Sequence, residues 1–204
     1  MRHLTVSLNK ILLALAGITL AGLALAKGTE SSPATGGVGE INFLLGKAVI
    51  TQANGSKVPA AIGVQIHVGD AIDTAANGHV QVRFIDNELV KVRPSSTMQV
   101  VRYDYNPQKP EDSAIKFNLV EGTSRAISGE GATKGRQNFR MNTPIAAIGV
   151  RGTDFIVNAD DRSVRALVKE GAIIVAPISG QCSADALGPC AGQELTGLSR
   201  QILQ

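Results

Sequence analysis

The sequence contains no tryptophan, and aromatic residues make up only 3% of its 204 residues. A hydrophobic core must therefore be built from Val, Ile, Leu and Ala, which suits thin, closely packed β layers. A carbohydrate cleft typically offers Trp or Tyr platforms, and the only tyrosines are Tyr103 and Tyr105. Their spacing of two projects both rings from one face of an extended segment, where core packing and a binding ledge are both open interpretations.

Cysteine and histidine are also scarce, which limits thiol and metal chemistry. The two cysteines, Cys182 and Cys190, bracket the short segment SADALGP. In an oxidising exported compartment such a pair is expected to form a disulfide that closes a small loop. A zinc site is the alternative, but two thiolates need further ligands, and the three histidines lie at positions 3, 67 and 79. We expect a disulfide.

One cluster has side chains suited to a metal or to acid-base chemistry: His67, Asp70, Asp73 and His79. Hard and borderline metals accept oxygen and imidazole ligands of this kind. The acids also stand where turns are expected, with Asp70 directly after Gly69, so we favour bonds to turn backbone. No Gly-x-Ser-x-Gly motif occurs, and GEGATKG lacks the ending of a phosphate loop. We predict no enzymatic activity, no cofactor and no metal.

The N-terminus has the pattern of a secretory signal peptide. Arg2 and Lys10 precede an apolar run from Ile11 to Ala26 that ends in Ala-Leu-Ala. We expect cleavage after residue 26, which would leave a periplasmic or secreted protein with no stable membrane insertion. An uncleaved anchor is the alternative, although this run of 16 residues is shorter than the roughly 20 that span a bilayer.

Removal of residues 1–26 leaves 18 basic and 17 acidic residues, a formal charge of +1. This balance gives no support for nucleic-acid binding, which needs a concentrated basic patch. A local excess of cations includes Arg136 and Arg140, with Glu130 as the single acid, and we interpret it as a solvated strand face. The candidate partner surface comprises Tyr103, Tyr105, Arg136 and Arg140.

Residues 27–37 are rich in Gly, Ser, Thr and Pro and are interpreted as a flexible leader. From residue 38 onward, short apolar and polar alternations are separated by Gly, Asn and Asp turns, and no long window shows a helical apolar stripe. We expect a β domain over residues 38–177 and a C-terminal tail, 178–204, with the disulfide loop. Residues 128–137 are predicted to be a mobile surface loop, and the last residues a weak helical turn.

The predicted fold class is all-β, either a short twisted β-solenoid or a double-layered β-sandwich. Similar turns recur at Gly69, Gly122 and Gly171, near 50 residues apart, as stacked layers would produce. The alternation in HVQVRF and again after Asn87 predicts a hairpin.

Five fragments in this order resemble the FecR-type domain of exported bacterial proteins. They are VGDAIDTAANGHVQVRFIDN, VRPSSTMQV, IKFNLVEGTSRA, FRMNTPIAAIGVRGTDFIV and VRALVKEGAIIVAP, within residues 38–177. The resemblance implies an all-β, solenoid-like extracytoplasmic domain without enzymatic activity. In the best-known members it is the periplasmic part of an anti-sigma regulator that listens to a TonB-dependent outer-membrane receptor.

The sequence departs from that arrangement. Only ten residues precede the apolar run and few follow residue 177, so we expect a stand-alone exported FecR-domain protein. Asn87 also stands where members commonly carry glycine, and asparagine tolerates the left-handed conformation of a hairpin turn.

Residues 141–157 place Arg151 between two glycines. Pro144 fixes φ and pushes Thr143 toward an extended conformation, while Gly149 and Gly152 permit sharp turns. We expect the guanidinium to act as a structural clamp on turn carbonyls or a buried carboxylate. An outward arginine that receives a partner's carboxylate is the alternative. The expected turn or clamp residues are Gly69, Asp70, Thr143, Pro144, Gly149, Arg151, Gly152 and Thr153.

We therefore expect a non-catalytic binding or scaffold module of the bacterial cell envelope that recognises a protein partner through strand edges or rows of turns. One alternative is a periplasmic signalling component that relays envelope or iron status to a membrane anti-sigma regulator or a TonB-dependent receptor. Another is a protein that binds or degrades a polysaccharide.

Overall fold

The computed structural model describes residues 36–197 and 200–203, with side chains for residues 36–197. The predicted signal peptide and nearly all of the predicted leader lie outside the described residues. Within the described part of the chain, no helix is long and apolar enough to cross a membrane.

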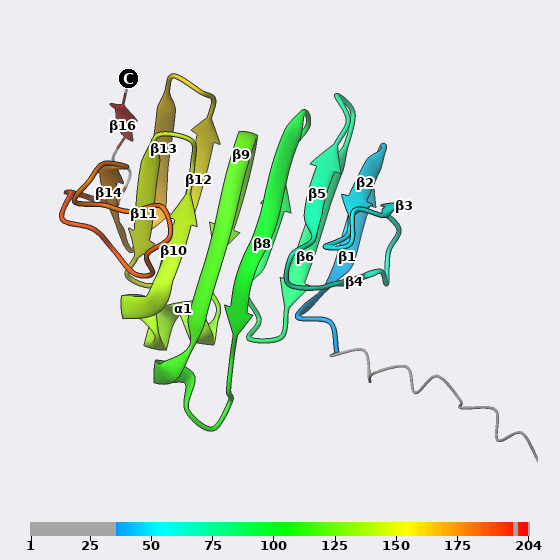
Figure 1. The fold of residues 1–204 in the computed structure, drawn as a ribbon, viewed down its shortest axis with the longest axis horizontal. Helices are drawn as coiled ribbons and strands as arrows, with labels where there is room; N and C mark the ends of the chain where they lie inside the picture. The colour runs from blue at the N-terminus through cyan, green and yellow to red at the C-terminus, as the bar shows by residue number, and fades with distance from the viewer. Residues whose placement is uncertain (1–35, 198–199, 204) are drawn as a thin grey trace, which may run out of the picture. The chain divides into compact units, whose positions relative to one another are not determined.

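Two sheet layers share one long strand, β9 (Ala114–Ile127). Layer A consists, in order, of β4 (Gln65–Ile66), β1 (Gly39–Leu45), β6 (His79–Phe84), β7 (Leu89–Val92), the second half of β9, β12 (Asp154–Ala159), β13 (Val164–Glu170) and β16 (Arg200–Leu203). Figure 1 shows β9 between the N-terminal strands, in blue to green, and the C-terminal strands, in yellow to red. The predicted all-β fold class is confirmed.

Layer B pairs on the first half of β9. It consists of β3 (Lys57–Pro59), β2 (Ala48–Thr51), β5 (Ala71–Thr74), β8 (Ser96–Asp104), β9, β10 (Phe139–Asn142), β11 (Ala146–Val150), β14 (Ala172–Pro177) and β15 (Gln193–Thr196). Only the β9 to β10 pairing is parallel. The helical segments are short: η1 (Pro110–Asp112), α1 (Glu130–Lys134) and η2 (Arg136–Asn138).

The core lies between the two layers and is mostly aliphatic. In β6 the inward residues are Val80, Val82 and Phe84, and in β8 they include Met98 and Val100. All belong to one buried cluster that draws on both layers, as the period of two along each strand requires.

Four of the seven aromatic rings gather at one place in this core. Phe84 stacks on Tyr103 with ring centroids 4.5 Å apart, and Phe117 meets both rings edge-on. Phe139 on β10 extends the group from the far side of Phe117. Most of the few aromatic side chains thus lie in the core, where each buries a large apolar area.

The chain passes repeatedly from one layer to the other, and glycines with positive φ stand at these crossings. They are Gly46 (φ 71°), Gly69 (95°), Gly122 (88°), Gly152 (71°) and Gly171 (78°). Gly122 lies inside β9, where the strand leaves layer B and enters layer A. The three turns that recur in the sequence, at residues 69, 122 and 171, are therefore all crossings between layers.

Two local predictions were wrong. Residues 130–134 form α1, and Gly131 and Ala132 are buried, so residues 128–137 are not simply a surface loop. Glycine permits this packing, because a Cβ on Gly129 would lie 2.4 Å from Asp86 Oδ2. At the C-terminus, residues 200–203 form the strand β16 on β13 instead of a helical turn, because the free edge of layer A offers backbone partners.

Candidate functional site

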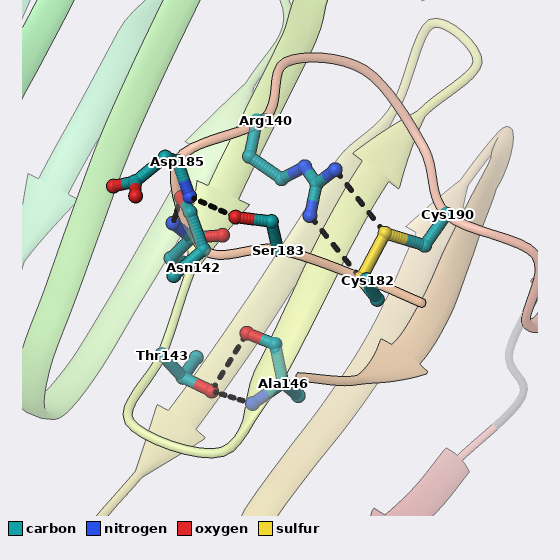
Figure 2. The surroundings of a disulfide bond; sticks show 9 residues. Arg140, Asn142, Thr143, Ala146, Cys182, Ser183, Asp185 and Cys190 are labelled. Carbon is teal, nitrogen blue, oxygen red and sulfur yellow. Dashed lines mark hydrogen bonds between the residues drawn. A yellow bond between two sulfur atoms is a disulfide. The ribbon is translucent and has the colours of Figure 1, made fainter. Parts of the chain in front are cut away.

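Most of the predicted turn residues do lie at turns. Asp70 is buried and accepts hydrogen bonds from the backbone N–H of His67 at 2.9 Å and of Ala53 at 3.3 Å. Thr143 and Pro144 form the turn between β10 and β11, where Thr143 Oγ1 accepts from Ala146 N–H at 2.9 Å (Figure 2). These side chains replace backbone partners that the turn itself cannot supply.

The clamp predicted for Arg151 is not found. Its side chain is 54% exposed and its described ion pair is with Glu194, at 3.4 Å. The physical reason is that the carbonyls of this crossing already have partners: Ala172 O accepts from Arg151 N–H at 2.9 Å, and Thr153 O accepts from Ser128 N–H. Thr153 and Ser128 also bond through their hydroxyls, so hydroxyl groups hold the crossing.

Gly149 and Gly152 have different roles from each other. Gly152 has positive φ and makes the bend between β11 and β12. Gly149 lies inside β11, where a Cβ would stand 2.6 Å from Pro189 Cβ. Glycine at position 149 therefore permits close packing of the disulfide loop, a role that the sequence did not indicate.

The cluster suspected of metal binding is dispersed by the fold. His67 Nδ1 lies 3.6 Å from Asp70 Oδ2, but Asp73 is in β5 and not in a turn. Asp73 accepts from the hydroxyls of Thr51 at 3.0 Å and Thr97 at 2.9 Å, on the two flanking strands. Within the described residues, no group of three or more His, Cys, Asp or Glu side chains could hold a metal ion.

The four residues proposed as a partner surface do not form one. Tyr103 is buried in the aromatic group, and Arg140 is only 1% exposed. Both side chains lie where a sheet face is covered. The opposite layer covers Tyr103, and the disulfide loop covers Arg140. Tyr105 donates to Glu130 Oε2 at 2.8 Å, and Arg136 is exposed on η2.

The predicted disulfide between Cys182 and Cys190 is confirmed. Its loop lies over the outer face of layer B, where Cys182 packs with Ala147 and Ala176. Figure 2 shows the guanidinium of Arg140 pointing from β10 toward both sulfurs. Nη1 lies 3.5 Å from Cys182 Sγ, and Nη2 lies 3.2 Å from Cys190 Sγ.

A buried acid cluster holds α1 in place. Asp86 accepts hydrogen bonds from the backbone N–H of Glu88 at 2.9 Å and of Gly131 at 3.0 Å, and also from the hydroxyl of Tyr103. The same hydroxyl lies 3.2 Å from Glu88 Oε2. Burial, reinforced by the negative charge of Asp86, raises the pKa of Glu88 well above its usual value.

The outer face of layer A is the surface best suited to a partner. Inward and outward residues alternate along its strands, and the outward charged residues are mostly basic. The cations are Arg83, Lys91, Arg93, Arg125, Arg165 and Lys169, and the acids on that side are Glu40, Asp154 and Glu170, which lies opposite Asp154 in the register of β12 and β13. We call this surface the cationic face.

Only part of this positive charge is neutralised by neighbouring carboxylates. Arg125 and Asp154 form a two-pronged ion pair, at 2.7 and 2.5 Å, and Lys169 Nζ lies 3.7 Å from the same carboxylate. Hydrogen bonds from Arg125 lower the pKa of Asp154. Among the described residues, Lys91 and Arg93 have no carboxylate within 4 Å. Lys91 even lies directly opposite Arg125 in the register of β7 and β9.

An apolar rim borders the cationic face at β1. Phe43 and Leu45 are 50% and 58% exposed and lie two residues apart on the same side of β1. A groove of about 380 Å³ is lined by these two residues together with His79, Gln81, Lys91 and others. The surface thus combines positive charge with an exposed hydrophobic edge. The sequence alone does not indicate this surface, because its residues come from strands that are far apart in the chain.

The comparisons with known proteins identify the family. The sequence profile of the FecR protein family matches residues 70–174, just over half of the 204 residues. The chain therefore belongs to the FecR family, and the resemblance noted from its fragments is confirmed.

The chain is also similar to two crystal structures of a candidate anti-sigma factor from Parabacteroides distasonis ATCC 8503, at 1.65 and 2.50 Å resolution. In both, the identity is 19%, the TM-score is 0.46, and the match covers 66% of this chain and 54% of that chain. The chain thus spans about half the length of these structures. The comparison with curated proteins gave no match.

Proposed function

We propose that this FecR-family chain is a non-catalytic recognition module of the bacterial cell envelope, and that its cationic face binds an acidic surface of a protein partner. The charge imbalance carries the proposal, because six cations and three acids share one sheet face on a chain whose predicted mature charge is only +1. Such a concentration of one sign steers an oppositely charged partner and fixes its orientation.

The apolar rim supports a protein partner over a small ion. Protein interfaces combine a desolvated apolar centre with charged residues around it, and Phe43 and Leu45 next to Lys91 and Arg93 supply both. Strand addition at a sheet edge, the other mode considered from the sequence, has weaker support. The described edge strands β3, β4, β15 and β16 have only two to four residues each, and such short edges offer little backbone for pairing.

Export is part of this proposal. The predicted signal peptide provides the route, and the Cys182 to Cys190 disulfide is a bond that persists in oxidising compartments such as the periplasm. Membership of the FecR family favours a signalling role for the recognition event, with a membrane regulator or an outer-membrane receptor as the class of partner. This second function uses the same surface and differs only in what the partner does.

A pair of crosslinking sites tests the proposal in living cells. A photo-crosslinking amino acid replaces Gln81, which lies on the cationic face opposite Lys91, or Gln99, which lies on the outer side of layer B. We expect a protein adduct from position 81 and none of the same mass from position 99. The double reversal Lys91→Glu with Arg93→Glu is expected to abolish the adduct while leaving the melting temperature within a few degrees, because both side chains lie on the outer face.

The outcomes separate the alternatives. Adducts of equal yield with and without the charge reversal would overturn the cationic face as the docking surface. Binding of the purified chain to vesicles of anionic phospholipid, lost in the reversal variant and accompanied by no protein adduct, would show a lipid surface as the partner instead. Mass spectrometry of the adduct decides between a receptor or regulator and another envelope protein.

A further inference from the structure

The guanidinium of Arg140 is buried against a disulfide, without a carboxylate. Arg140 is 1% exposed, its Nη1 and Nη2 contact the two sulfurs, and its Nε has no hydrogen-bond partner among the described residues. No Asp or Glu of the described residues lies within 4 Å of it. A buried cation without an anion is costly, so this arrangement needs a reason.

Reduction of the disulfide would supply the missing anion. A disulfide sulfur is neutral and accepts hydrogen bonds only weakly, whereas a thiolate carries a full charge and pairs strongly with a guanidinium. A neighbouring arginine lowers the pKa of a cysteine thiol for this reason. The position of Arg140 therefore favours the reduced pair over the oxidised pair, because only the reduced pair has a charge to match.

Two other charged groups, Lys116 and Asp185, lie near the loop. Lys116 lies directly opposite Arg140 in the register of β9 and β10 and is only 7% exposed. Burial lowers the pKa of Lys116 and of Arg140, and the negative charge of Asp185 opposes the shift at Lys116. Asp185 stands on the loop itself and is exposed, so its charge is screened by water. Arg140 is therefore the charged group in direct contact with the two sulfurs.

We propose that Cys182 and Cys190 form a redox-active pair, reduced in the cell envelope by a dithiol oxidoreductase, with Arg140 stabilising the thiolate that is released. A thiolate of the donor attacks Cys190 Sγ, the bond between the two sulfurs breaks, and Cys182 leaves as a thiolate. The second thiol of the donor, once deprotonated, attacks the donor's first sulfur in the mixed disulfide and releases Cys190 as a thiolate. The donor ends as a disulfide, and two electrons have passed to this chain.

Exposure decides the order of these steps. Cys190 is half-buried, whereas Cys182 is only 4% exposed, so the incoming thiolate reaches Cys190 first. The leaving group is then Cys182, whose sulfur lies 3.5 Å from Nη1 of Arg140. Reduction removes the covalent closure of the loop over Ala147 and Ala176 on layer B. The redox state of the pair thereby controls how firmly that apolar part of the sheet is covered.

The equilibrium constant for reduction tests the proposal. Mature protein is equilibrated with dithiothreitol buffers, and the reduced fraction is read from the mass of the alkylated product. Arg140→Met keeps an unbranched side chain, although a shorter one, and removes the charge and its donors, and we expect it to lower the equilibrium constant about tenfold or more, a potential shift of about 30 mV. Arg140→Lys keeps a charge and is expected to change the constant less. Arg136→Met, at an exposed position of η2, is the control and is expected to match the wild type.

A second measurement covers the case in which Arg140→Met fails to fold. The pKa of the more reactive thiol in the reduced wild-type protein is obtained from alkylation rates across pH, and we expect it to lie clearly below the free-cysteine value of about 8.5. The proposal is overturned by an unchanged or higher equilibrium constant in Arg140→Met, or, if that variant does not fold, by a wild-type thiol pKa at or above the free value.

Discussion

Thr74 Oγ1 accepts a hydrogen bond from the backbone N–H of Ser96 at 3.0 Å and donates to the carbonyl of Arg93. This hydroxyl joins the end of β5 to the crossing between β7 and β8, and it also lies 3.0 Å from the carbonyl oxygen of Ser96. Thr74→Val keeps the shape and leaves a buried N–H unsatisfied, which costs roughly 1–3 kcal/mol. Urea unfolding measures the loss, and a change below about 0.5 kcal/mol would contradict the role assigned to Thr74.

Arg151→Ala is expected to behave differently. The side chain is exposed and its pair with Glu194 is long and solvated, so we expect a loss below about 0.5 kcal/mol. Measured in the same urea series, this variant is the counterpart of Thr74→Val. A loss as large as that of Thr74→Val would restore the clamp predicted for Arg151 from the sequence.

Gly171 is expected to tolerate no side chain. Its φ is +78°, and a Cβ would lie 2.0 Å from the carbonyl oxygen of Gly152 at the neighbouring crossing. Gly55 has a similar φ of +84° but nothing within 4 Å of a Cβ. We expect Gly55→Ala to lose about 1–2 kcal/mol from backbone strain alone and Gly171→Ala to lose at least about 3 kcal/mol.

The difference between the two alanine variants isolates the clash from the strain. Equal losses in thermal or urea unfolding would mean that the two crossings at residues 152 and 171 separate easily. That result would contradict the close approach of the layers at this corner.

The strand pattern of the fold could be predicted from the sequence because it depends on local information. Alternation in β6 and β7 and the tolerance of Asn87 for a left-handed φ, here +67°, are properties of neighbouring residues. The crossings at Gly69, Gly122 and Gly171 were visible for the same reason. The disulfide followed from compartment chemistry and from the presence of only two cysteines.

The sites could not be predicted, because they depend on which strands become neighbours. Lys91 and Arg125 are 34 positions apart in the sequence and face each other only through the pairing of β7 with β9. The sequence predicts an exposed Arg140, and only the position of the disulfide loop over β10 shows that this side chain is buried. Tyr103 looked equally suited to a core and to a ledge, and only the position of Phe84 on the opposite layer decides between them.

Asp154 is expected to stabilise the folded protein at neutral pH but not in strong acid. Its pKa is lowered, mainly by hydrogen bonds from Arg125, so the folded state prefers the ionised carboxylate. The stabilisation is present above the unfolded pKa of about 3.9 and is lost as the pH falls through the lower folded pKa. Asp154→Asn should therefore cost about 1 kcal/mol at neutral pH and nothing at the acid end.

Unfolding free energies across pH test this, with Asp104→Asn as the matched control. Asp104 pairs with Arg102 at the surface, where both side chains are at least half exposed, so a change of only a few tenths of a kcal/mol is expected. If the two asparagine variants show the same pH profile, the ion pair of Arg125 is no more than a surface contact.

Glu88 is expected to have the opposite effect on the pH dependence of stability. Burial raises its pKa well above the usual value, and the charge of Asp86 adds to this, so the folded state prefers the protonated form. The favourable contribution is fully present below the unfolded pKa of about 4.3 and is lost as the pH rises through the folded pKa. Glu88→Gln is neutral at every pH and keeps an oxygen for the Tyr103 hydroxyl.

We therefore expect Glu88→Gln to match the wild type in mild acid and to be more stable than it by roughly 1–3 kcal/mol at alkaline pH. Glu130→Gln is the control, because Glu130 also accepts from a tyrosine hydroxyl, that of Tyr105, but at the surface. It should change stability little at any pH. A Glu88→Gln variant that is less stable than the wild type at alkaline pH would show that the ionised carboxylate is needed in the cluster that anchors α1 and is satisfied there by donors such as the Tyr103 hydroxyl.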